Sequence, residues 1–175
     1  KNHTSRRDAF ETVGAKPLGR AEWESGEVSF RREIAPRGAE PNDLAADLET
    51  DVELVKFVPG SDPSMLSVAD GASGLVIEGT GLGHVNTEWI DRIEKLVEDG
   101  TTVVMTSQCL EGRVCDRVYD TGRDLIEAGV VEAGDTLPAT AYVKLMWALE
   151  HTEDPADTMR RSIAGELQER SVPWT

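Results

Sequence analysis

The chain has 175 residues, 39% of them hydrophobic, with a formal net charge of -15 at pH 7 and a pI near 4.5. This length can bury one substantial core, and the negative field excludes a nucleic-acid surface made by this chain alone, because phosphates are repelled. No apolar run approaches the ~20 residues that span a bilayer, and residues 1–7 lack the apolar core of a signal peptide, so we expect a cytoplasmic protein without a membrane partner.

The charged residues and the cysteines narrow the class further. Arginine (13) outnumbers lysine (5) in an acidic chain, which favours a halophilic source; an ordinary acidic cytosolic protein is the alternative. Cys109 and Cys115 form neither a disulfide framework nor a metal-binding knuckle, and the three histidines are scattered. We therefore expect no metal.

The sequence pattern of residues 1–36 indicates the end of a domain and not its beginning. Ser5-x-x-Asp8 is similar to a capping box and predicts a short helix from about Ser5. Residues 21–30 predict a hairpin that turns at Ser25–Gly26. Its candidate buried residues are Trp23, Val28 and Phe30. Residues 37–50 are rich in Pro, Gly, Ala, Asn, Asp and Glu without apolar periodicity, and predict a linker.

Residues 51–175 predict an α/β domain. Strand and helix signals alternate, which indicates a flavodoxin-like parallel sheet with crossover helices. The expected strands are 52–58, 74–78 and 102–106, and the expected helices are 63–69, 88–98, 120–128, 139–151 and 154–164. The helix over 88–98 has an apolar face of Ile90, Ile93, Leu96 and Val97.

A glycine-rich loop follows the strand 74–78, with glycine at 79, 81 and 83. The dinucleotide-binding spacing G-x-G-x-x-G begun at Gly79 requires glycine at 84, where the chain has His84, and no Gly-Lys-Ser/Thr follows. Nucleotide binding is therefore disfavoured. A structural tight turn, or a role at a substrate or a subunit interface, stays open.

Polar residues Thr106-Ser107-Gln108 end the strand 102–106. At the carboxyl end of a parallel sheet such groups can contact a small ligand or cap the following loop, and we favour capping. The chain lacks a G-x-S-x-G elbow, and no Ser/His/Asp constellation can be assembled from His3, His84 and His151.

Several strings of the sequence are long enough to compare with known families. They are KNHTSRRDAF (1–10), PL (17–18), VPG (58–60), GLVIEGTGLGH (74–84), VMTSQ (104–108), DTGRDLIEAG (120–129), LP (137–138) and VKLMW (143–147). Together they resemble the asparaginase/glutaminase family, above all its archaeal branch that forms the D subunit of a tRNA-dependent amidotransferase. The resemblance implies that residues 1–36 end a first domain and that 51–175 form the family's C-terminal domain. The family's two upstream threonine motifs, which include the nucleophile, do not occur in this chain.

The resemblance also implies site residues. Lys1 matches the family's catalytic lysine, an amine that accepts a proton from a threonine hydroxyl. Family active sites form at dimer interfaces, which places His84, with Gly83, near the substrate held by the partner. Tyr119 and Thr121 are weaker candidates for the same edge.

The function implied by the resemblance is glutaminase/asparaginase-type amide hydrolysis that supplies ammonia for converting Glu-tRNA(Gln) to Gln-tRNA(Gln). The expected partners are a second copy of the chain, the E subunit of the amidotransferase, tRNA(Gln) held by that E subunit, and glutamine or asparagine as substrate. No cofactor is expected in this chain, since ATP and Mg would be used by the E subunit, and the chain alone should be inactive. A cytoplasmic type I L-asparaginase and a non-catalytic dimerisation domain are the alternatives.

Overall fold

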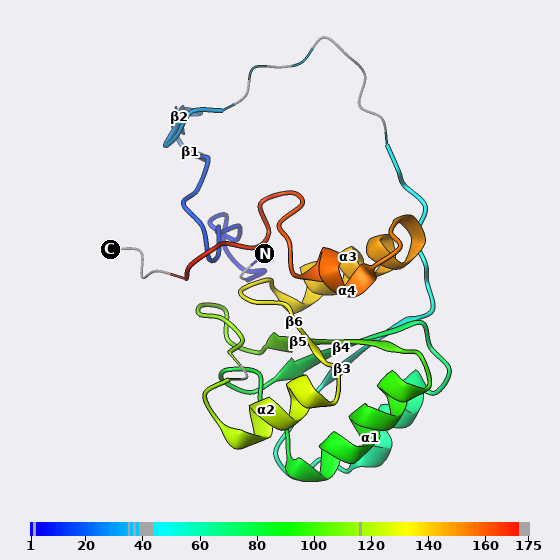
Figure 1. Ribbon diagram of the computed structural model, residues 1–175. Helices are drawn as coiled ribbons and strands as arrows, with labels where there is room; N and C mark the ends of the chain where they lie inside the picture. The colour runs from blue at the N-terminus through cyan, green and yellow to red at the C-terminus, as the bar shows by residue number, and fades with distance from the viewer. Residues whose placement is uncertain (2, 35, 37, 39–43, 116, 172–175) are drawn as a thin grey trace. The chain divides into compact units, whose positions relative to one another are not determined.

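The computed structural model describes residues 1–171 except 2, 35, 37, 39–43 and 116, and its two compact units are residues 1–44 and 45–171 (Figure 1). Part of the predicted linker 37–50 lies outside the described residues. No helix in the described ranges combines the length and the apolar character needed to cross a membrane.

The first unit contains the predicted hairpin. Strands β1 (Gly19–Ala21) and β2 (Val28–Phe30) pair antiparallel, with Gly19 opposite Phe30 and Ala21 opposite Val28. The turn closes through Gly26, which adopts a φ of 69° and donates its N–H to Glu22 O at 2.9 Å. The hairpin prediction is confirmed.

Two other predictions for this unit are wrong. The Ser5 helix does not form, because the Asp8 carboxylate accepts from the side chains of Arg6 and His3 and does not act in a capping box. The candidate core residues of the hairpin, Trp23, Val28 and Phe30, are all more than half exposed. A two-stranded hairpin with three residues in each strand has too little surface to bury these side chains. The Arg7 guanidinium does stack on the Trp23 ring, 3.8 Å from its centroid.

The second unit is a parallel four-stranded sheet in the order β3-β4-β5-β6. Its strands are β3 (Val52–Lys56), β4 (Gly74–Gly79), β5 (Thr102–Ser107) and β6 (Val131–Glu132). The predicted α/β class and the three predicted strands are confirmed. Strand β6 was not predicted, because two residues are too short to show a period.

Helices cover both faces of this sheet (Figure 1). They are η1 (Pro63–Ala69, a 3₁₀ helix), α1 (Thr87–Glu98), α2 (Asp120–Glu127), α3 (Pro138–His151) and α4 (Pro155–Met159). The apolar cluster on one face includes residues of η1, α1 and α2, whereas α3 packs on the other face. The sheet is therefore buried on both sides, as its apolar strands predict.

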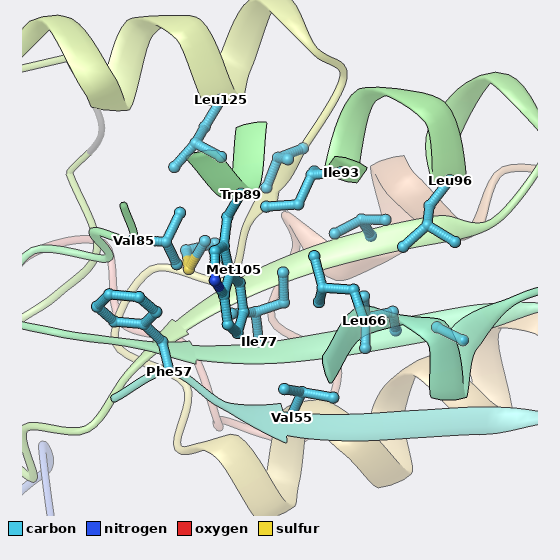
Figure 2. Packing of buried hydrophobic residues seen from close by; sticks show 14 of the residues in the cluster. Val55, Phe57, Leu66, Ile77, Val85, Trp89, Ile93, Leu96, Met105 and Leu125 are labelled. Carbon is cyan, nitrogen blue, oxygen red and sulfur yellow. The ribbon is translucent and has the colours of Figure 1, made fainter. Parts of the chain in front are cut away.

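The larger core cluster is centred on Trp89 of α1 (Figure 2). Its ring meets Phe57 edge-on with centroids 5.1 Å apart, and its Nε1 donates to Ser61 O at 3.1 Å, so the buried indole N–H has a partner. The predicted apolar face of α1 is largely confirmed, since Ile93 and Leu96 are fully buried. Ile90 and Val97 are only partly buried, and the prediction omitted Trp89.

The predicted helix 154–164 ends early, at Met159, for an electrostatic reason. The ammonium of Lys144, on α3, donates to Met159 O at 3.3 Å and to Arg161 O, and pairs with the Glu166 carboxylate at 2.7 Å. Glu166 in turn accepts from Ile163 N and, at 2.7 Å, from Ala164 N. These contacts occupy the backbone groups that a continuing helix would use.

The Lys144–Glu166 pair is buried, with side chains 6% and 12% exposed. Burial by itself would raise the pKa of Glu166, but the hydrogen bonds from Lys144 and from the backbone N–H groups outweigh it and lower that pKa to about 2. The ion pair therefore fixes the segment that follows α4 to the body of the second unit.

The replacement Glu166→Gln should reduce the free energy of unfolding by about 2–4 kcal/mol at pH 7, since it leaves the Lys144 ammonium buried without a counter-charge. Because the folded pKa lies below the unfolded value of 4.5, the contribution is complete above pH 4.5 and is lost as the pH falls toward 2. Urea unfolding over this pH range, at constant salt, measures the difference between the two proteins.

Glu150→Gln, at an exposed position of α3, is the matched control and should leave stability within about 0.5 kcal/mol. A Glu166→Gln deficit that does not shrink between pH 4.5 and 2 would contradict the linkage.

Candidate functional site

The glycine loop begins where β4 ends and closes on itself. Thr80 and His84 form an antiparallel bridge in which each backbone N–H donates to the other's carbonyl at 2.9 Å, and Gly83 N also donates to Thr80 O at 3.0 Å. The N–H groups of Gly83 and His84 are therefore used inside the loop. A phosphate-binding loop presents such groups to its ligand, so this geometry agrees with the failed nucleotide spacing.

Each glycine of the loop has its own structural reason. Gly81 and Gly83 adopt φ values of 53° and 106°, which residues other than glycine rarely adopt. A Cβ on Gly79 would lie 2.7 Å from the Gly83 carbonyl carbon and 2.9 Å from the sulfur of Met105. The alternating glycines thus serve a tight turn that folds back on its own strand.

The polar end of β5 holds this loop in place. Ser107 Oγ donates to Gly81 O at 2.6 Å and accepts from Cys109 N at 3.0 Å. Gln108 donates its N–H to Gly79 O at 2.9 Å, and its side-chain amide donates to Phe57 O and Glu78 O. The capping role favoured for Thr106-Ser107-Gln108 is confirmed for Ser107 and Gln108, whose donors go to carbonyls of the glycine loop and of the ends of β3 and β4, whereas Thr106 donates to Ile77 O within the sheet.

His84 is the functional candidate of this edge. Its ring meets Tyr119 edge-on, with centroids 5.0 Å apart and planes at 73°, and the side chain is half-buried. Its Nε2 is buried and has no hydrogen-bond partner in the described part of the chain. Buried polar atoms in folded proteins are nearly always paired, so a partner for this nitrogen is expected from outside the described residues.

The other predicted site residues lie in different places. Gly83 precedes His84 in the loop, and Tyr119, at the N-cap of α2, packs on the His84 ring. Thr121 is in the first turn of α2. Lys1 belongs to the first unit and is exposed there. Within the described ranges, no group of three or more His, Cys, Asp or Glu side chains could hold a metal.

A contact that the sequence did not predict also reaches the loop. Cys115 N donates to Leu82 O at 2.9 Å, so the segment before α2 binds the tip of the glycine loop. The backbone carries this contact, and the identity of the side chain gave no signal for it.

A polar hollow of about 380 Å³ lies between η1 and α1. Its lining residues are Ser67, Asp70, Gly71, Arg92, Lys95 and Asp99. An ion pair between Arg92 and Asp70 lies within it. The residues of this hollow precede β4 and β5, at the amino ends of the strands, whereas ligands of parallel sheets bind at the carboxyl ends. The glycine-loop edge is therefore the candidate site.

Comparison with known proteins identifies the domain of the second unit. Residues 51–161 match the Glutaminase/Asparaginase C-terminal domain. The D subunit of glutamyl-tRNA(Gln) amidotransferase from Halobacterium salinarum is 59% identical over all of this chain and 43% of its own length. The protein of the same name from Haloquadratum walsbyi is 60% identical over 99% of this chain and 40% of its own length. The chain thus spans about two-fifths of the curated relatives it matches.

Solved structures give the same fold. The thermostable L-asparaginase from Thermococcus kodakarensis superposes with a TM-score of 0.84 and 32% identity, over 97% of this chain and 53% of its own. L-asparaginase I from Vibrio cholerae, at 22% identity and a TM-score of 0.77 over 94% of this chain and 52% of its own, shares the fold. Given the domain match over 51–161 and this likeness, the chain belongs to the asparaginase/glutaminase family.

Proposed function

We propose that this chain is part of the D subunit of a tRNA-dependent amidotransferase, which hydrolyses a side-chain amide and supplies ammonia for converting Glu-tRNA(Gln) to Gln-tRNA(Gln). The observation that carries the proposal is the 59% identity, over the whole chain, to a relative of that name. Since the chain spans 43% of that relative, the activity is proposed for a longer protein that also includes the part of the relative that this chain does not cover.

The proposed chemistry needs a nucleophile from a segment outside this chain and a base from within it. A threonine hydroxyl, from a segment outside this chain, attacks the amide carbon; the C–N bond breaks, ammonia leaves, and water then hydrolyses the acyl-enzyme ester. A hydroxyl is a weak nucleophile at neutral pH, so it needs a base. We assign that role to Lys1, whose amine takes the hydroxyl proton when it is uncharged.

His84 would contact the substrate from a second copy of the chain. The Nε2 atom is buried and unpartnered in the described part of the chain, and the self-closed glycine loop fixes the His84 backbone through the bridge to Thr80. An imidazole nitrogen can donate to a carboxylate or accept from an ammonium, both of which an amino-acid amide carries. We therefore propose that a homodimer completes the site, with Gly83 and His84 at its edge.

The charge of -15 supports a division of labour with a second protein. A chain of this charge repels the tRNA backbone, so we propose that the E subunit binds tRNA(Gln) and uses ATP and Mg, while this chain needs no cofactor and acts in the cytoplasm. Co-purification with the E subunit, and amide hydrolysis that increases when charged tRNA is added, test this proposal.

A type I L-asparaginase is the second candidate, favoured by the 32% identity to the Thermococcus enzyme. It predicts hydrolysis of free asparagine that is independent of tRNA and of any partner. A non-catalytic dimerisation domain predicts a stable dimer and no hydrolysis even with the upstream segment present.

In the protein that includes the upstream segment, Lys1→Met should lower kcat for ammonia release by about 10²-fold or more, because the hydroxyl loses its base. Lys16→Met removes another exposed lysine of the first unit and should leave kcat unchanged. Steady-state ammonia release with glutamine and with asparagine measures both variants. A Lys1→Met protein with wild-type kcat would remove Lys1 from the mechanism.

His84→Phe tests the imidazole nitrogen separately from the ring. Phenylalanine keeps the aromatic contact with Tyr119 but lacks Nε2, so kcat/KM should fall about 10-fold for both His84→Phe and His84→Ala. Sedimentation should show an unchanged oligomeric state for His84→Phe. Wild-type kinetics in His84→Phe, with a defect only in His84→Ala, would reduce His84 to a packing residue.

A further inference from the structure

The segment Arg113-Val114-Cys115 makes contacts in three directions. The Arg113 guanidinium donates to Glu169 O at 3.0 Å and to Gln168 O at 3.4 Å, on the segment that follows α4. Val114 N donates to Gly134 O at 2.9 Å, just after β6, and Cys115 N donates to Leu82 O at 2.9 Å, in the glycine loop. Three consecutive residues thus connect the C-terminal segment, the sheet and the glycine loop.

The far end of this connection is firmly held. Besides the Lys144–Glu166 ion pair, Asp135 accepts from Gln168 N at 2.9 Å through one carboxylate oxygen, and from Ser171 Oγ at 3.3 Å through the other. The segment 166–171 has no helix or strand of its own, so these side chains supply the partners that regular structure would otherwise provide. Arg113 thus donates to a segment that has several side-chain contacts of its own with the second unit.

Gly134 shows that the packing at this junction is close. Its φ is 61°, and a Cβ there would lie 2.5 Å from the Leu167 side chain and 3.1 Å from Arg113 Nη2. The absence of a side chain at 134 lets Leu167 and the Arg113 guanidinium occupy the same small space. The junction is therefore built around the arginine, and a shorter side chain would leave it open.

The near end of the connection is the functional edge. Leu82 lies two residues before His84, inside the loop closed by the Thr80–His84 bridge. The Cys115 N–H supplies the partner of the Leu82 carbonyl, so a shift of residues 113–115 would weaken this support of the turn that carries His84. We propose that Arg113 is a positioning residue: it couples the segment 166–171 to the glycine loop and holds His84 in the orientation that the substrate needs.

This inference rests on the proposed role of His84, but it can be tested apart from it. In the full-length protein with its amidotransferase partner bound, Arg113→Ala should increase hydrogen exchange at the amides of residues 82–84 and 115 by about 10-fold or more, while the core amides of α1 stay protected. KM should rise about 5-fold with kcat within about 2-fold of wild type, because binding is affected and the chemical step is not.

Two matched variants sharpen the test. Arg113→Lys keeps a positive charge but replaces the two guanidinium donors by one ammonium group. Its hydrogen exchange at the loop and its KM should both be intermediate between those of wild type and of Arg113→Ala. Arg123→Ala removes an exposed arginine of α2, whose contact with Asp120 is 3.5 Å long, and should change neither. A KM effect without increased loop exchange overturns the coupling, and increased exchange with unchanged KM overturns the positioning role.

Failure of the proposed function gives a different result. If the full-length protein hydrolyses no amide, or if His84→Phe has wild-type kinetics, the site assignment fails whatever Arg113 does. The exchange measurement then still decides whether Arg113 holds the loop.

Discussion

The pairing of β4 with β5 is the constraint on which the candidate site depends. Its parallel register places Gly79 opposite Ser107, so the last residues of two strands buried on both faces end at the same edge. The backbone groups that leave the sheet there have little access to water and need partners. Ser107 and Gln108 supply them, and in doing so they fix the glycine loop that begins at the neighbouring strand end.

Features that depend on local patterns were predictable from the sequence. The buried strands appear as apolar runs, α1 appears as a face of 3.6-residue period, and Gly79, Gly81 and Gly83 mark a turn that must fold tightly. The case against nucleotide binding also followed from spacing alone, because His84 replaces a required glycine. The resemblance to the family singled out His84 and Gly83, and the structure adds the reason for interest in His84, an imidazole nitrogen without a partner in the described part of the chain.

Features that depend on long-range contacts were not predictable. The helix expected over 154–164 has a reasonable local pattern, but it ends at Met159 because Lys144, fifteen residues earlier, takes the Met159 carbonyl. The connection from Arg113 to residues 168 and 169 likewise joins positions more than fifty residues apart. Neither has a period or a motif. Burial of the hairpin residues failed for the opposite reason, since alternation predicts an apolar face but not that another element covers it.

The polar groups at this edge also indicate how a site here must work. The donors of Ser107 and Gln108 and the amides of Gly83 and His84 are all directed to protein carbonyls. Among the described residues, only Ser61 Oγ and His84 Nε2 are buried side-chain atoms without a partner, and Ser61 precedes η1, outside the glycine loop. The single His84 Nε2 atom can make one hydrogen bond, so in the proposed function it would contact only one of the polar groups of an amino-acid amide. This limited capacity is the reason why the proposed function includes a second copy of the chain, whose groups would complete the site at this edge.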